Sequence, residues 1–298
     1  MMNTSKIVIF FGTEDFSAVA LQALIDAGHP VVAVVTKPDT FRGRGRTRLV
    51  KPPVKEIAER HNIEVWQPNK LADIAHKIES LRPVAGVLSA YGKIIPKSIL
   101  DLFEPGIINI HPSLLPKYRG PSPIETAIAN GDAATGVTLM QLVPEMDAGP
   151  IYAQETVPLS DSETRPELYD ELARLGAELL LKNLPQILDG LRQPAEQETE
   201  QVSYTHLLTK EQAYLDQTAF TAKQAERLVR AHLGYPKTKV TIAGHDIIVL
   251  KSHVTDSAAT LLDLPFKDDT YLSIDELIAP SGRTVTKQAY LNGYAAGA

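Results

Sequence analysis

Short apolar runs alternate with longer amphipathic stretches through the first half of the chain. The runs are rich in Val, Ile and Phe and are continuous, which is typical of strands covered on both faces, as in a parallel sheet. They occupy residues 6–12, 31–37, 85–92, 106–111 and 136–143. The helices predicted between them occupy residues 15–28, 53–61, 70–81 and 121–130. This βαβ rhythm predicts an α/β domain with a doubly wound, mostly parallel sheet.

A leucine stripe predicts one long helix after these elements. From Leu168 to Leu179 the leucines recur at spacings of four, three and four, which places them on one face of a helix over residues 164–189. Thr164 is a residue type that caps a helix start. We expect this helix to be the last one of the first domain.

The hydrophobic pattern changes in the last third of the chain. A helix is predicted at 221–233, and two strands follow that are joined at Ala243 and Gly244, a hairpin signal. Shorter strands are expected around 259–263, 270–278 and 283–287. This pattern predicts a smaller β-rich domain, with a barrel of the oligonucleotide-binding (OB) type as the expected form.

A polar stretch after Gly190 separates the two patterns. It is poor in large apolar residues, which is typical of a linker that runs over the surface. The predicted domains are therefore 1–190 and 206–298, and the linker is 191–205.

Composition and charge narrow the function classes. The net charge of −6 gives no general attraction to nucleic acid, so such a partner would need a local basic patch. The chain has no cysteine, which excludes disulfides, thiolate zinc sites and thiol nucleophiles, and its eight histidines include no close pair at ligand spacing. No apolar run reaches membrane-spanning length, and the run near the start is too short for a signal peptide. We expect a soluble cytoplasmic protein.

Polar side chains interrupt the apolar pattern at two strand ends. Asn109 and His111 are two residues apart, so they point to one face of the sheet near its carboxyl edge, where open parallel sheets bind ligands. The strand at 136–143 ends in a loop that carries Asp147. An amide, an imidazole and a carboxylate without a Ser or Cys nucleophile suit direct attack by a substrate amine on a carbonyl. The alternative is that Asn109 and His111 only satisfy turn backbone.

Three segments resemble the folate-dependent formyltransferases, in which an Asn-x-His pair and a downstream Asp form the active site. They are "NIHPSLLPKYRGPSPIETAI" from Asn109, "TGVTLMQL" from Thr135 and "MDAGPI" from Met146. The resemblance covers the whole first domain, including "GTEDF" at 12–16 and "SAYGKIIP" at 89–96. It implies a Rossmann-like domain that transfers a formyl group from 10-formyltetrahydrofolate to an amine without a metal ion.

The resemblance also implies a role for individual positions. The catalytic trio would be Asn109, His111 and Asp147. The folate-binding positions, which lie in two loops, would be Lys93, Ile94, Ile95, Val143 and Glu145. The wall beside the trio, on the acceptor side, would comprise Ser113, Leu114, Leu115 and Pro116, with Arg119 and Gly120 after them.

One basic segment could serve as the local basic patch that an acidic protein needs to bind nucleic acid. Residues 37–55 carry seven Lys or Arg side chains against one acid, Asp39. The pattern "KPD…GRG…PPVK" is similar to the loop of the methionyl-tRNA formyltransferase family that meets the acceptor arm of the initiator tRNA, and the C-terminal third resembles that family too. The implied tRNA contacts are Arg42, Arg44 and Arg46. The alternative is a solvated surface loop.

The implied partners are therefore methionyl-initiator tRNA and the folate donor. The protein itself is expected to be a monomer that does not associate with a membrane. Some residues depart from the tRNA enzymes: Pro112 stands where Gly is frequent, and "KYRG" and "DAGPI" resemble sugar N-formyltransferases, which act on nucleotide-linked amino sugars. An amino sugar thus stays open as the alternative acceptor. "GTEDFS" after the first strand lacks the glycine spacing of dinucleotide-binding turns, which disfavours a dehydrogenase.

Overall fold

The computed structural model describes residues 7–43, 45, 47–81 and 84–294. These residues form two units that interleave along the chain. The first consists of the described part of Met1–Gly120, with Gly136–Val157 and Tyr169–Tyr204. The second consists of Pro121–Thr135, Pro158–Leu168 and the described part of Thr205–Ala298. The two domains predicted from sequence, 1–190 and 206–298, are each a continuous stretch of chain, and that division stays a prediction.

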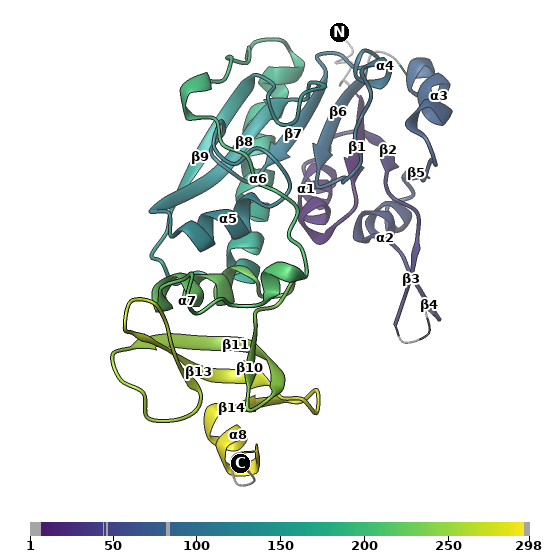
Figure 1. Ribbon diagram of the computed structural model, residues 1–298. Helices are drawn as coiled ribbons and strands as arrows, with labels where there is room; N and C mark the ends of the chain where they lie inside the picture. Colours follow the sequence, from purple (N-terminus) through teal and green to yellow (C-terminus); the bar gives the residue numbers. More distant parts are fainter. Residues whose placement is uncertain (1–6, 44, 46, 82–83, 295–298) are drawn as a thin grey trace. The chain divides into compact units, whose positions relative to one another are not determined.

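A seven-stranded sheet forms the centre of the first unit (Figure 1). Its strand order is β5-β2-β1-β6-β7-β8-β9, and the pairs from β5 to β7 are parallel. The strands are β1 (Ile7–Gly12), β2 (Val31–Val35), β5 (Glu64–Trp66), β6 (Val84–Ser89), β7 (Ile107–His111), β8 (Ala134–Gln141) and β9 (Ile151–Pro158). The α/β fold with a large, mostly parallel sheet is thus confirmed.

Strand β8 runs antiparallel to β7, with Gln141 opposite Ile108 and Thr138 opposite His111. Its apolar run carries no sign of this direction, because an antiparallel strand buried on both faces has the same continuous pattern as a parallel one. The edge strand β9 was not predicted. Its apolar residues at 151–153 are followed by Gln, Glu and Thr, so the apolar run is too short to indicate a strand.

Helices of the first unit lie on both faces of this sheet. The rings of Phe16 in α1 and Tyr169 in α6 meet with centroids 5.3 Å apart, and Gly176 of α6 lies against Ile110. On the other face, Ile9 packs in one apolar cluster with residues of η1, α3 and α4. The helices are α1 (Asp15–Asp26), α2 (Pro53–Arg60), η1 (Leu71–Ile74), α3 (Ala75–Ser80), α4 (Lys97–Leu100), α6 (Arg165–Leu188) and η2 (Thr199–Gln201). Across the described stretches, no helix is long and apolar enough to cross a membrane.

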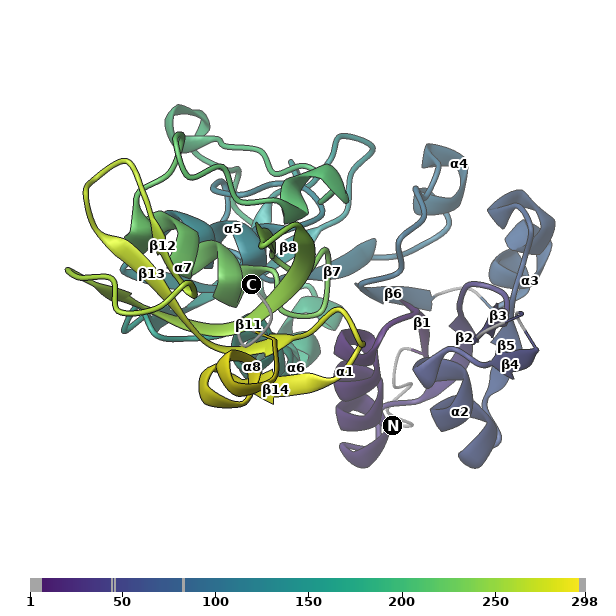
Figure 2. The ribbon, with the colours of Figure 1, turned by 60° about the horizontal axis from the view of Figure 1, so that its bottom comes forward.

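The second unit is built on a five-stranded antiparallel sheet (Figure 2). The predicted hairpin is present at Ala243 and Gly244, which both have positive φ, as a two-residue turn requires. Ala225 and Val229 of α7 pack on the sheet. The elements are α5 (Pro123–Asn130), η3 (Glu211–Ala213), α7 (Ala222–Ala231), β10 (Lys239–Ile242), β11 (His245–Thr255), β12 (Asp263–Pro265), β13 (Tyr271–Ile278), β14 (Thr284–Thr286) and α8 (Lys287–Tyr294).

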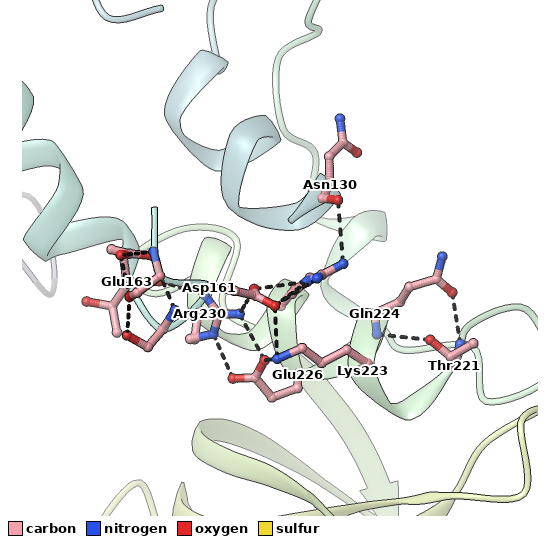
Figure 3. A network of polar contacts seen from close by, with 12 residues as sticks. Asn130, Asp161, Glu163, Thr221, Lys223, Gln224, Glu226 and Arg230 are labelled. Carbon is pink, nitrogen blue, oxygen red and sulfur yellow. Dashed lines mark hydrogen bonds and ion pairs between the residues drawn. The ribbon is translucent and has the colours of Figure 1, made fainter. Parts of the chain in front are cut away.

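A charged network around Asp161 joins the segment before α6 to helix α7 (Figure 3). The Asp161 carboxylate accepts hydrogen bonds from Arg227 Nη2 at 2.7 Å and Arg230 Nη2 at 2.9 Å, and Lys223 Nζ lies 3.1 Å away. These three cations share one face of α7 because they recur at spacings of four and three. The Arg227 hydrogen bonds, with those of Lys223 and Arg230, hold the pKa of Asp161 well below its usual range.

Replacing Asp161 by Asn should lower the free energy of unfolding at pH 7 by about 2 kcal/mol, because three cations would then face a neutral amide. The folded-state pKa is depressed, so the carboxylate stabilises the fold above its ordinary pKa of 3.8, and this contribution is lost as the pH falls below that value. Urea unfolding at pH 7 and pH 3 tests both points. As a control, Asp101→Asn removes an exposed pair with Lys97 and should cost less than about 0.5 kcal/mol.

Candidate active site

Strand β7 presents the two polar residues on one face of the sheet. Asn109 and His111 are each only 5% exposed. Ile110 between them points to the opposite face, where Gly176 of α6 packs so closely that an added Cβ would lie 2.7 Å from the Ile110 side chain. The alternation of the strand therefore separates the polar face from the helix-covered face.

The His111 ring has hydrogen-bond acceptors on both sides. Its Nε2 lies 3.0 Å from the carbonyl oxygen of Tyr118, so Nε2 carries a proton, because a carbonyl can only accept. Its Nδ1 lies 3.7 Å from Asp147 Oδ2. That distance is longer than a hydrogen bond, so the carboxylate and the ring are close neighbours that are not hydrogen-bonded to each other.

Asp147 reaches His111 from an unexpected direction. Since β8 is antiparallel to β7, the loop that follows Gln141 starts level with Ile108, at the other end of β7 from His111. The loop returns along the strand, and Asp147 Oδ2 accepts a hydrogen bond of 2.7 Å from the backbone N–H of Gly120. Strands β7 and β8 therefore end at opposite edges of the sheet, and the Asp147 side chain still lies close to that of His111.

The Asn109 amide has no hydrogen-bond partner among the residues that the structure describes. Asn109 lies two residues before His111 on β7, so both side chains point to the same face of the sheet. A buried amide without a protein partner is costly unless a ligand or water satisfies it. Asn109 is therefore free to donate a hydrogen bond to a substrate.

The loop after His111 is held by its own hydrogen bonds. Ser113 is buried, and its hydroxyl donates to the carbonyl of Lys117 at 2.7 Å. The N–H of Leu115 donates to the Thr138 hydroxyl at 3.1 Å. Leu114 and Pro116 are half-buried. Ser113 and Leu115 thus shape this loop, while Leu114 and Pro116 retain surface for a ligand.

The predicted folate positions lie in the loops after β6 and β8. Lys93 Nζ donates to the carbonyl of Pro68 at 3.1 Å, and Ile95 is buried in the core. Ile94 is 88% exposed, an apolar side chain that a flat heterocycle could cover. The remaining two positions, in the loop after β8, are half-buried Val143 and exposed Glu145.

The basic segment forms a two-stranded ribbon, β3 (Thr40–Arg42) and β4 (Arg48–Val50), outside the seven-stranded sheet (Figure 1). Phe41 and Leu49 pair across it, and both side chains are exposed. Arg44, Arg46 and the side chain of Arg42 lie outside the described residues.

Two lysines at the end of this segment have acidic partners. Lys55 pairs with Asp39 at 2.9 Å, and Lys51 pairs with Glu59 at 2.6 Å. Their charges are thus largely neutralised within the protein.

Sequence reasoning missed three participants: the carbonyl of Tyr118, the N–H of Gly120 and the side chain of Gln197. Tyr118 and Gly120 have φ of +60° and +116°, which turns their backbone groups toward His111 and Asp147. Backbone groups leave no mark in a residue pattern. Gln197 belongs to a stretch whose composition indicated only a linker.

Comparisons with known proteins identify the family of the chain. Residues 5–184 match the formyl transferase family. The chain is 41% identical to the methionyl-tRNA formyltransferase of Halorhodospira halophila (strain DSM 244 / SL1) over 96% of this chain and 96% of that protein.

Two solved structures share the fold at lower identity. A variant of HypX from Aquifex aeolicus is 17% identical with a TM-score of 0.69, and the match covers 99% of this chain and 50% of HypX. The N-formyltransferase of Helicobacter canadensis, in complex with folinic acid and dTDP-3-aminofucose, is 19% identical with a TM-score of 0.67, over 90% of this chain and 98% of that one. By sequence match and fold, the chain belongs to the formyl transferase family and, within it, to the methionyl-tRNA formyltransferases.

Proposed function

We propose that the protein transfers the formyl group of 10-formyltetrahydrofolate to the α-amino group of methionyl-initiator tRNA, a step of translation initiation. The observation that carries this proposal is the meeting of His111 and Asp147 on the face of β7 that also presents Asn109, in a chain 41% identical to a methionyl-tRNA formyltransferase. This arrangement supports a shared role for Asn109, His111 and Asp147 in one reaction.

The chemistry follows from the three side chains. The free amine attacks the formyl carbon, and the carbonyl oxygen becomes an oxyanion that the Asn109 amide stabilises by donating a hydrogen bond. His111 shares that stabilisation or protonates the oxyanion. Asp147, 3.7 Å from the ring, either orients it by its charge or helps to remove the proton that the attacking amine loses, directly or through water. The bond from the formyl carbon to the folate nitrogen then breaks, and that nitrogen takes up a proton.

The folate donor is assigned to the loops after β6 and β8. The exposed side chain of Ile94 offers an apolar surface to the pterin ring, and backbone groups near Ile95, Val143 and Glu145 would bind its polar edge. The complex of the Helicobacter canadensis relative with folinic acid supports this class of donor.

A nucleotide-linked amino sugar is the second candidate acceptor. The specific observation in its favour is that the Helicobacter canadensis structure, with the same fold, holds dTDP-3-aminofucose. The end-to-end match with a methionyl-tRNA formyltransferase at 41% identity, against 19% for the sugar enzyme, favours the tRNA. The basic ribbon has no evident use with a sugar nucleotide.

One assay separates the two acceptors. The protein is given 10-formyltetrahydrofolate labelled in its formyl group, with either methionyl-initiator tRNA or a nucleotide-linked amino sugar. We expect label on the methionyl-tRNA. Label on the sugar alone would overturn the proposal, as would release of labelled formate with neither acceptor modified.

Neutralising Arg42 and Arg44 with Gln should weaken tRNA binding and flatten its salt dependence, while kcat at saturating tRNA changes little. Each lost phosphate contact reduces the slope of log affinity against log salt by about one, so the double variant should lose about two. Binding titrations at several salt concentrations measure this slope.

The matched control makes the same charge change at exposed Arg60 and Arg174, which lie outside the ribbon. It should bind tRNA as the unaltered protein does. An unchanged slope in the Arg42 and Arg44 variant would assign the tRNA to another surface.

Three further expectations belong to this proposal. The C-terminal sheet is taken as a barrel of the OB type, which its five antiparallel strands and the bulges in β11 support. Residues 1–190 are taken as the catalytic domain, joined by 191–205 to a C-terminal domain over 206–298. The protein is expected to act as a monomer in the cytoplasm, where initiator tRNA is used.

A further inference from the structure

Gln197 is a buried polar residue in the stretch predicted to be a surface linker. It is 9% exposed, and Arg119, which faces it, is 8% exposed. The Gln197 Oε1 accepts hydrogen bonds from Arg119 Nε at 3.1 Å and Nη2 at 2.7 Å. The Gln197 Nε2 donates to the carbonyls of Asp147 at 2.8 Å and Gly149 at 2.7 Å. One amide therefore joins the loop after His111 to the loop that carries Asp147.

The Asp147 loop depends on such support. Asp147 has a φ of +48°, a left-handed conformation that is uncommon for residues with a side chain, so its backbone gains from outside support. Its carboxylate is held by the Gly120 N–H, and its own carbonyl is held by Gln197. Gly149 has no room for a side chain, because an added Cβ would lie 1.8 Å from the carbonyl oxygen of Gln141.

The linker segment also holds the other loop. The N–H of Arg119 donates to the carbonyl of Ser203 at 2.9 Å, and the Ser203 hydroxyl accepts from the N–H of Tyr118 at 2.9 Å. Tyr118 in turn bonds the His111 ring through its carbonyl. Both partners of the 3.7 Å approach between His111 and Asp147 are thus positioned from residues 197–203.

We propose that Gln197, oriented by Arg119, is a positioning residue for formyl transfer that sets where Asp147 stands against His111. The inference rests on the proposed function of that pair. Gln197 touches neither reacting group, and it acts by holding the backbone that carries the carboxylate. A misplacement of about 1 Å at a reacting group can cost up to about 100-fold in rate, so a smaller shift is expected to cost about 10-fold.

The variant Gln197→Glu isolates this role. The new carboxylate still accepts from Arg119, but it places an acceptor against the two carbonyls that Gln197 served as donor. We expect kcat to fall about 10-fold, with the KM for methionyl-tRNA within about twofold of the unaltered protein. The matched control is Gln193→Glu, because the exposed Gln193 amide donates only to the carbonyl of Gly190 among the described residues. It should leave kcat unchanged.

A double-mutant cycle separates positioning from a general structural role. If Gln197 acts through the carboxylate, Gln197→Glu should cost less than about twofold in kcat once Asp147 is Asn. The same 10-fold loss in both backgrounds, or a loss confined to KM, would overturn the proposal.

The hydrogen bonds by which Gln197 holds the Asp147 loop form a clamp between the two loops. Amide hydrogen exchange tests this clamp without any assay of activity. Exchange of the Gly120 N–H, which bonds Asp147, should be faster in Gln197→Glu and unchanged in Gln193→Glu. Unchanged exchange at Gly120 in Gln197→Glu would refute the clamp even if the protein formylates tRNA. Faster exchange in a protein that formylates no acceptor would instead leave the clamp standing and refute the proposed function.

Discussion

Replacing Asn109 by Ala lowers kcat for formyl transfer by about 100- to 1000-fold, the cost of removing one donor from an oxyanion site. The large effect is expected because the side-chain amide is buried, has no partner among the described residues, and stands beside His111 on β7. The donor acts on charge that develops only in the transition state, so the KM values should change little. Steady-state kinetics with both substrates varied measure the split.

A second buried asparagine provides the control. Asn183 is 3% exposed, and its Nδ2 donates to the carbonyl of Leu179 at 2.7 Å within α6. Asn183→Ala deletes a buried amide of the same kind and should lower thermal stability without changing kcat. Equal losses of kcat in the two variants would show that Asn109 acts through the fold, and the oxyanion role would be withdrawn.

Replacing His111 by Ala lowers kcat by about 100-fold or more and leaves tRNA affinity nearly intact. The ring lies between two acceptors, Tyr118 and Asp147, and the orienting role proposed for Asp147 acts through this ring. Its loss should therefore remove most of the effect of the carboxylate as well. In the His111→Ala background, Asp147→Asn should cost less than about threefold in kcat, although it is costly alone.

Single-turnover rates and tRNA binding, measured on the same preparations, check this prediction. His232, an equally buried histidine in the second unit, supplies the control through His232→Phe, which should not change the rate of the chemical step. Weakened tRNA binding with an unchanged chemical rate in His111→Ala would reverse the assignment of His111 from catalysis to acceptor binding.

The strands and helices whose buried residues form a continuous or periodic apolar pattern could be predicted from the sequence alone. The run at 106–111 became β7, and the leucine stripe became α6, because the spacing of apolar side chains is set by the geometry of each element. Elements whose apolar residues form no long run or clear period were missed. The edge strand β9 and the C-terminal helix α8 are examples, since both are short or largely exposed.

The candidate site could be predicted only as far as its residue types. Asn109 and His111 stand out because they are polar within or at the end of an apolar run, and Asp147 because it lies in the loop after another such run. Their meeting depends on a loop that returns along an antiparallel strand, and on the N–H of Gly120. A backbone donor has the same chemistry at every residue, so no residue pattern could have indicated it.

Gln197 is a second residue whose role a residue pattern could not indicate. Its polar neighbours indicate a solvated linker, yet its amide is buried between two loops whose residues lie 78 and 50 positions earlier in the chain. Local periodicity was enough to indicate five of the seven strands of the first unit's sheet, all except β5 and β9, because each of the five strands buries its own side chains. The direction of β8, the route of the Asp147 loop and the burial of Gln197 depended on which distant segments come together, and hydrogen bonds between distant segments form only once the chain has folded.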